Sequence, residues 1–252
     1  MPIIVNADDF GMSSSVNAAI AESLRRGWIS SATLMGNMPA FGEAVELTRQ
    51  HGLVGRIGVH LNLTEGMPLT DEIRRQPRLC TREGQFRAKA RDLYIVSGAE
   101  RSAIHGELRA QVLACRNAGV EPSHLDSHHH VHTSWAVGGI AIAIARELGI
   151  PFIRPAHNAG GLISRKHKLY SAFFNQRLRG LAGIRYFCNV TSATPALLDA
   201  KGGIEVMVHP VMQADGRVTD SGDRDELGPL LARLLAGRSC LSYGELAARQ
   251  NP

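Results

Sequence analysis

The sequence predicts an α/β fold, a single-domain (β/α) barrel with about seven or eight mostly parallel strands and an active site at their C-terminal ends. Short β-branched runs alternate along the chain with longer stretches of helical periodicity. Parallel neighbours need such a crossover helix between them. The phosphate-binding loops GxGxxG and GxxxxGK[ST] do not occur, which disfavours a nucleotide fold. A length of 252 residues with 44% hydrophobic residues is enough for one domain.

The first strand and helix show the pattern most clearly. Residues 2–9 form a β-branched run that ends in polar side chains, as a buried strand does when its end opens onto a site. Ser13 to Ser15 then offer helix-capping hydroxyls, apolar residues recur at helical spacing, and Gly27 is a stop signal.

The same alternation continues along the domain, which we expect to span residues 1–252. Residues 65–98 interrupt it with a loop insertion that has no clear period, and either a substrate-binding lid or a surface excursion without a role would explain it. Further strands are expected at 32–36, 57–60, 123–127, 151–154, 186–190, 204–208 and 239–241, and helices at 40–50, 100–118, 136–148, 166–181, 225–236 and 243–250.

Composition excludes several partners. The net charge of +5 comes from dispersed arginines and only 5% of residues are aromatic, so we expect no nucleic-acid binding. No apolar run is long enough for a signal sequence or a membrane span, and the four cysteines lie far apart, as in a reducing compartment. We therefore expect a cytoplasmic protein without a membrane partner. The sequence does not determine the oligomeric state, and a homodimer is one of the options.

Candidate functional residues fall at the ends of predicted strands. In (β/α) barrels the C-terminal strand ends converge on one mouth, where catalytic residues lie. Sequence-distant side chains would therefore meet there. The residues at these ends are Asp8, Asp9, His60, Asp126, His128, Arg154 and His209.

A histidine-rich segment is the strongest single signal. His124–His132 contains five of the 11 histidines of the chain, and neutral imidazole is a common ligand for divalent metals. In an extended conformation, Asp126, His128 and His130 would share one face while His129 points away. We expect Asp126 and His130 to orient the ligands.

The pair Asp8 and Asp9 would complement these histidines. Two adjacent carboxylates at a strand end point in different directions, so one can bind a cation while the other handles a proton. A turn or cap before a helix would also explain them. One carboxylate and two imidazoles leave coordination positions for water and substrate, as a catalytic metal needs, and His209 could serve as a general acid. No GxSxG motif supports covalent catalysis.

The sequence resembles the YdjC-type carbohydrate deacetylases, which include chitooligosaccharide deacetylases. The resemblance implies a (β/α) barrel that hydrolyses an N-acetyl group of a small acetylated sugar and releases acetate. By matching motif it implies that Asp9, His60 and His128 hold the metal, that Asp8 is the base and His209 the acid, and that Arg154 orients the catalytic aspartate. It rests on the motifs Asn6–Gly11, Gly58–Leu61, His124–His132 and Val208–Pro210.

The expected cofactor is one divalent metal ion per chain. The resemblance implies Mg²⁺, whereas one aspartate with two histidines is a ligand set that suits Zn²⁺ or a similar ion better. Two other functions fit the same residues. A metal phosphoesterase would favour a second metal about 3.5 to 4 Å from the first, and a sugar-binding or metal-storing protein would show no turnover.

Overall fold

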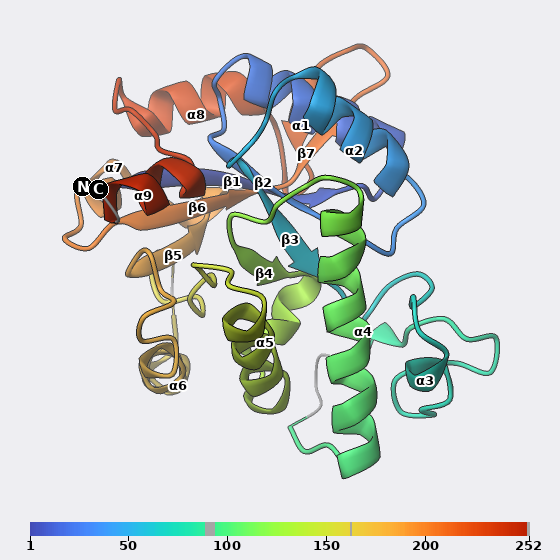
Figure 1. Cartoon of the computed structure of the whole chain (residues 1–252). Helices are drawn as coiled ribbons and strands as arrows, with labels where there is room; N and C mark the ends of the chain where they lie inside the picture. The colour runs from blue at the N-terminus through green and yellow to red at the C-terminus, as the bar shows by residue number, and fades with distance from the viewer. Residues whose placement is uncertain (89–93, 162, 251–252) are drawn as a thin grey trace.

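Parallel strands form the central sheet of the protein. The computed structural model describes residues 1–88, 94–161 and 163–250. The sheet has six strands in the order β4-β3-β2-β1-β6-β5 (Figure 1). They are β1 Ile3–Phe10, β2 Ser31–Leu34, β3 Ile57–Leu61, β4 Leu125–Ser127, β5 Tyr186–Asn189 and β6 Ile204–Val208.

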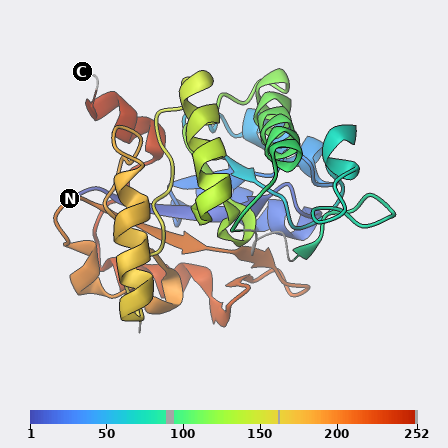
Figure 2. The ribbon, with the colours of Figure 1, turned by 90° about the horizontal axis from the view of Figure 1, so that it is seen from below.

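Helices cover the sheet on two sides. In Figure 1, α1, α2 and α8 lie above it and α4, α5 and α6 below, and Figure 2 shows the latter three side by side. The helices are α1 Ser14–Arg25, α2 Phe41–Gln50, α3 Asp71–Arg74, α4 Gly98–Asn117, α5 Trp135–Glu147, α6 Arg165–Gln176, α7 Pro195–Leu198, α8 Leu227–Leu235 and α9 Tyr243–Gln250, with 3-10 helices η2 His128–Thr133 and η3 Val190–Ser192.

The predicted αβ alternation is confirmed in most of its elements. The helix α1 begins where the serine run predicts it, because the Ser13 side chain accepts a hydrogen bond from the Val16 amide. Its apolar residues Val16, Ile20 and Leu24 are buried in the main core. Such capping and one-sided burial are local properties, which explains why sequence periodicity finds them.

The predicted number of strands is wrong, and the parallel sheet is a partial barrel. The stretch 151–154 makes only an isolated bridge, between Ile153 and Leu125 of β4. Beyond it, the amides of Asn158 and Ala159 donate to the Phe187 carbonyl of β5. The chain therefore crosses the open side of the sheet without adding a full strand there.

The end of the chain also differs from the prediction. Residues 239–241 form no strand, although the Leu241 amide donates to the Ile3 carbonyl. A small antiparallel sheet, unforeseen from the sequence, has the order β7-β8-β9. Its strands β7 Pro210–Met212, β8 Val218–Asp220 and β9 Asp223–Glu226 are too short to show a hydrophobic period.

The insertion is packed against the domain. It contains α3 and an antiparallel bridge between Cys80 and Phe86. The buried carboxylate of Glu107 on α4 accepts hydrogen bonds from the amides of Leu69 and Thr70. Part of the predicted loop, residues 89–93, lies outside the described residues. No helix that the structure describes is long and apolar enough to cross a membrane.

Candidate metal and acid–base site

A bulge at the end of β1 turns two adjacent carboxylates toward one histidine. The register of β1 against β2 shifts between Ala7 and Phe10, and Asp9 takes a φ of 71°. The His60 Nε2 atom lies 3.2 Å from Asp9 Oδ1 and 4.0 Å from Asp8 Oδ2. The expectation that the two side chains point in different directions holds only for a regular strand, and the bulge removes that condition.

His60 is fixed from its other side by the neighbouring strand. The pairing of β3 with β4 places His60 opposite Asp126, with His60 Nδ1 2.7 Å from Asp126 Oδ1. The Thr33 hydroxyl of β2 donates to Asp126 Oδ2 over 3.0 Å. Burial lowers the pKa of His60, but Asp126 and Asp8 outweigh it and raise that pKa to about 10. The surroundings of this imidazole thus strongly favour positive charge.

His128 completes the group at the start of η2. Its Nδ1 atom lies 2.8 Å from Asp9 Oδ1, and its Nε2 atom lies 3.0 Å from Glu65 Oε2. Burial raises the pKa of Asp9, yet the hydrogen bonds with His128 and His60 hold it well below its ordinary value. One carboxylate oxygen therefore faces two ring nitrogens.

Asp9, His60 and His128 could hold a metal ion. Their ligand atoms all lie within 4.8 Å of one another. A proton on His60 Nδ1, donated to Asp126, would leave the Nε2 lone pair free for a cation, which is the usual carboxylate–histidine–metal arrangement. A second set, Asp8, His60 and Asp126, meets the same distance limit. Arg154 already neutralises both of its carboxylates, so the first set fits a metal ion better.

The guanidinium of Arg154 lies fully buried beneath the site. Its Nη1 and Nη2 atoms donate to the two oxygens of Asp8 over 2.7 and 2.6 Å. Nη2 also lies 2.7 Å from Asp126 Oδ2, and Nε donates to Glu205 Oε1 over 2.7 Å. Burial raises the pKa of Asp8, but the charge and hydrogen bonds of Arg154 outweigh this effect and hold the pKa below its ordinary value. Asp8 therefore stays ionised. Arg154 therefore contacts the predicted catalytic aspartate directly.

The remaining histidines of the segment point elsewhere. The expectation of an extended face is wrong beyond Ser127, because His129 and His130 take φ values of 51° and 55° within η2. The ring of His130 packs edge-on against Phe187 at 5.6 Å, and burial lowers its pKa to about 3. In the described part of the chain, the buried Nδ1 atom of His130 has no hydrogen-bond partner, so this atom does not orient the ligands. His124 stacks on Tyr243 at 3.8 Å.

His209 follows β6 on the same side of the sheet. Its backbone amide donates to Asp220 Oδ2 over 2.6 Å, which fixes the turn into β7. The imidazole is half-buried, and its charge contributes to lowering the pKa of Asp8. His209 is thus close enough to Asp8 to influence its pKa.

Two carboxylates of this region were missed by sequence reasoning. Glu65 opens the insertion four residues after the end of β3, and its place in a loop near a strand end was the available signal. Glu205 is a charged residue within the apolar strand β6, and a charge inside such a run implies a buried partner. Neither signal in the sequence indicates which residue Glu65 or Glu205 contacts.

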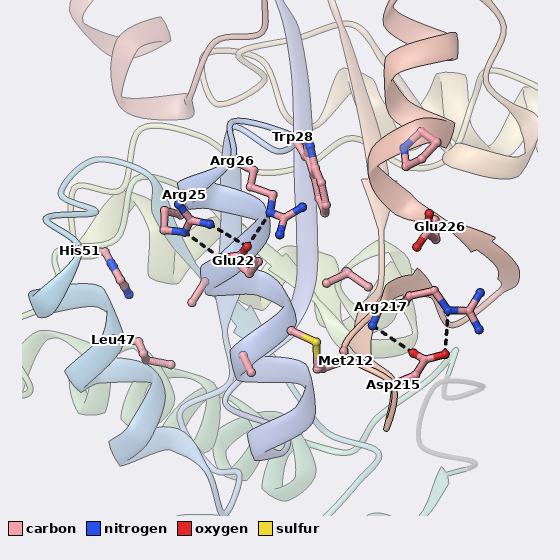
Figure 3. Close-up of a pocket in the computed structure, with 15 residues that line it drawn as sticks. Glu22, Arg25, Arg26, Trp28, Leu47, His51, Met212, Asp215, Arg217 and Glu226 are labelled. Carbon is pink, nitrogen blue, oxygen red and sulfur yellow. Dashed lines mark hydrogen bonds and ion pairs between the residues drawn. The ribbon is translucent and has the colours of Figure 1, made fainter.

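A surface depression of about 650 Å³ lies away from these residues. Figure 3 shows it between α1, α2 and the β7–β8 turn, where Glu22 pairs with Arg25 and Arg26. Across the depression, Asp215 pairs with Arg217. Because these charges already have partners, we assign the depression no ligand.

The curved parallel sheet and its buried carboxylate–histidine group define an α/β protein with a candidate metal site at the strand ends. The chain belongs to the family of YdjC-like proteins, whose model matches residues 2–240. The resemblance found in the sequence motifs is therefore confirmed.

Two carbohydrate deacetylases that are similar to this chain support its membership of the family. A carbohydrate deacetylase of Brevibacillus brevis is 43% identical over 155 residues, which cover 62% of this chain and 60% of that protein. This chain thus spans less than two thirds of that relative's length. A carbohydrate deacetylase of Halalkalibacterium halodurans is 32% identical over 212 residues, covering 83% and 85% of the two chains.

A solved structure shares the fold. The crystal structure of an Enterococcus faecalis V583 protein, described as a proposed cellobiose-phosphate cleavage protein, superimposes with a TM-score of 0.76 at 25% identity. The match covers 97% of this chain and 98% of the other. The partial barrel is therefore a fold that this crystal structure also contains.

Proposed function

We propose that the protein is a metal-dependent hydrolase that removes an N-acetyl group from an acetylated amino sugar or small oligosaccharide and releases acetate. The observation that carries this proposal is the convergence of Asp9, His60 and His128 within 4.8 Å, beside the ionised carboxylate of Asp8. The two relatives named as carbohydrate deacetylases support the sugar substrate and the acetyl group.

Asp9, His60 and His128 would hold one divalent ion in this enzyme. Such an ion, when bound, polarises the amide carbonyl and lowers the pKa of water. The donor set of one carboxylate and two imidazoles favours Zn²⁺ or a similar ion, while the family resemblance favours Mg²⁺. Asp126 would keep the His60 ring in the orientation that aims Nε2 at the site.

Asp8 and His209 would move the protons. Asp8 is held ionised and in place by Arg154, so it can accept a proton from an attacking water. The arginine also weakens Asp8 as a base, and the water must therefore be acidified before Asp8 can deprotonate it. His209 would donate a proton to the leaving amine nitrogen, since histidine is the side chain that most often serves in general acid–base catalysis.

A metal phosphoesterase is the main competing function. It would favour two metal ions, but the second ligand set shares His60 with the first and its carboxylates are paired with Arg154. The description of the Enterococcus faecalis protein names a phosphorylated disaccharide, cellobiose phosphate, as its substrate. Phosphorylated disaccharides therefore belong in the assay.

Acetate release from N-acetylglucosamine oligomers tests the proposal. We expect activity in the metal-loaded protein, none after complete chelation, and recovery when metal is added back. Elemental analysis should find about one ion per chain. Phosphate release from cellobiose phosphate with two ions per chain would favour the phosphoesterase, and acetate release that survives complete metal removal would contradict the mechanism.

A further inference from the structure

A chain of buried contacts links Asp8 to the C-terminal helix. Arg154 bonds to both oxygens of Asp8 and donates from Nε to Glu205 Oε1 over 2.7 Å. The other oxygen of Glu205 accepts a hydrogen bond of 2.6 Å from the Tyr243 hydroxyl. Arg154, Glu205 and Tyr243 each have an exposed fraction of 0%. No solvent molecule can substitute for a lost contact in this row without repacking.

These buried contacts run from one end of the sheet to the other. Glu205 is the second residue of β6, whereas Asp8 lies near the C-terminal end of β1. Tyr243 opens α9 and packs with Ile4, Phe152, Ile184 and Leu246 in a small separate core. Figure 1 shows α9 beside β1 and β6. An element remote from the metal ligands therefore reaches the predicted base through two side chains.

The contacts with Arg154 and Tyr243 explain why a charged residue, Glu205, lies inside the sheet. Burial raises its pKa, and Arg154 and Tyr243 counter that effect. A buried carboxylate is tolerated only when it is paired and hydrogen-bonded. Arg154 meets Asp8 with both Nη atoms. Glu205 Oε1 lies 2.7 Å from Nε and 2.6 Å from Nη2, so Glu205 limits how the guanidinium can rotate in its plane. The Phe187 ring, 4.7 Å from the guanidinium carbon, supports that plane from one side.

We propose that Glu205 and Tyr243 are positioning residues: Tyr243 holds Glu205, Glu205 holds Arg154, and Arg154 thereby sets the orientation of Asp8. The proposal rests on the function assigned above, in which Asp8 accepts a proton. Tyr243 lies beyond residue 240, where the match to the family model ends. This chain thus supplies the last contact from a segment outside the matched region.

Conservative variants separate positioning from packing. Tyr243→Phe keeps the ring that stacks on His124 at 3.8 Å and removes only the hydroxyl. Glu205→Gln keeps the shape of the side chain and removes its charge. Ser23→Ala is the control, because it deletes another fully buried hydroxyl, bonded to the Ala19 carbonyl of α1 and remote from the site.

The first measurement is the kinetics of acetate release. We expect kcat to fall about tenfold in Glu205→Gln and about threefold in Tyr243→Phe, with KM and metal content unchanged. Ser23→Ala should keep the parent kcat. The double variant should match Glu205→Gln alone, because Tyr243 acts through Glu205. Parent kcat in both single variants, or equal losses of kcat and bound metal, would overturn the proposal.

The second measurement does not depend on activity. In ¹⁵N NMR spectra, the Arg154 Nε–H group should give a slowly exchanging signal, assigned by its loss in Arg154→Lys. We expect this signal to shift in both Glu205→Gln and Tyr243→Phe and to stay in place in Ser23→Ala. If the parent releases no acetate, the proposed function fails while this experiment still tests the contact chain. An Arg154 Nε–H signal that is unchanged in both Glu205→Gln and Tyr243→Phe would refute the positioning role of these two residues.

Discussion

At the scale of single residues, the backbone of Asp9 decides how the site is built. A non-glycine residue with positive φ costs about 1 to 3 kcal/mol unless its surroundings hold it there. Here the Asp9 side chain contacts both His60 and His128, at 3.2 and 2.8 Å. The strained conformation lets Asp8 keep its contact with Arg154 while Asp9 turns to the histidines. Two neighbouring carboxylates can therefore take different tasks.

Asp8→Asn separates proton transfer from metal binding. The substitution removes the charge with little change in volume, and Asp8 is not in the ligand set that we assign to the metal. We expect the metal content to stay the same and kcat to fall about 10² to 10⁴-fold. Asp199→Asn, at a surface carboxylate paired with Arg238, is the control and should keep parent kinetics. Acetate release and elemental analysis check both, and a fully active Asp8→Asn variant would remove Asp8 as the base.

His124 should make the fold sensitive to acid. Burial, and then the charge of Arg154, hold its pKa well below 6.5. The unfolded chain binds a proton here below about pH 6.5 while the folded protein does not, so stability is intact above that pH and is lost as pH falls below it. As pH falls below 6.5, the parent should lose up to about 1.4 kcal/mol per pH unit more than His124→Gln. Urea unfolding at several pH values measures this difference, and equal slopes would contradict the assignment.

At the scale of elements, the insertion contributes to the site through its first residue. Glu65 opens the segment after β3 and lies 3.0 Å from His128 Nε2, on the side of the ring turned away from Asp9. Asn62 holds the start of this loop, since its side-chain oxygen accepts hydrogen bonds from the amides of Thr64 and Glu65. The predicted loop is thus tied to a candidate metal ligand.

Glu65→Gln should weaken metal binding without unfolding the insertion. A carboxylate on the far nitrogen of a ligating histidine fixes the ring and raises its basicity, and its loss costs about tenfold in affinity. Calorimetric titration of the metal-free protein with Zn²⁺ measures the change. Glu72→Gln, an exposed residue of the same insertion, is the matched control and should bind as the parent does. Identical affinities for Glu65→Gln and the parent would exclude this role.

At the scale of the whole molecule, the candidate ligands join three strands of one sheet. Asp9 belongs to β1 and His60 to β3, while His128 follows β4 directly. The neighbouring pairs β3–β4, β2–β3 and β1–β2 carry these residues to the same edge. An ion held by all three would therefore oppose separation of the strands.

Metal binding should stabilise the entire fold. At a free Zn²⁺ concentration about 100 times Kd, the free energy of unfolding should rise by about 2.7 kcal/mol, because the unfolded chain lacks the assembled site. Thermal unfolding with and without Zn²⁺ measures this gain. Asp9→Asn should abolish most of it, and a parent protein whose Tm does not respond to Zn²⁺ would contradict the site.

The sequence by itself determined most of the helices and parallel strands and the strand ends at which Asp8, Asp9, His60 and His128 lie. Those features follow from hydrophobic period, capping residues and turn glycines, all of which act over a few neighbours. It also carried the motifs that identify the family.

Only the tertiary structure decided how these residues meet. The β1 bulge, the turn of η2 through His129 and His130, and the incomplete strand at Ile153 depend on contacts between segments far apart in the chain. The contacts from Arg154 through Glu205 to Tyr243 join three separate segments of the chain, because a buried charge must find a partner. Periodicity reports which face is buried, but it carries no information about which buried groups touch.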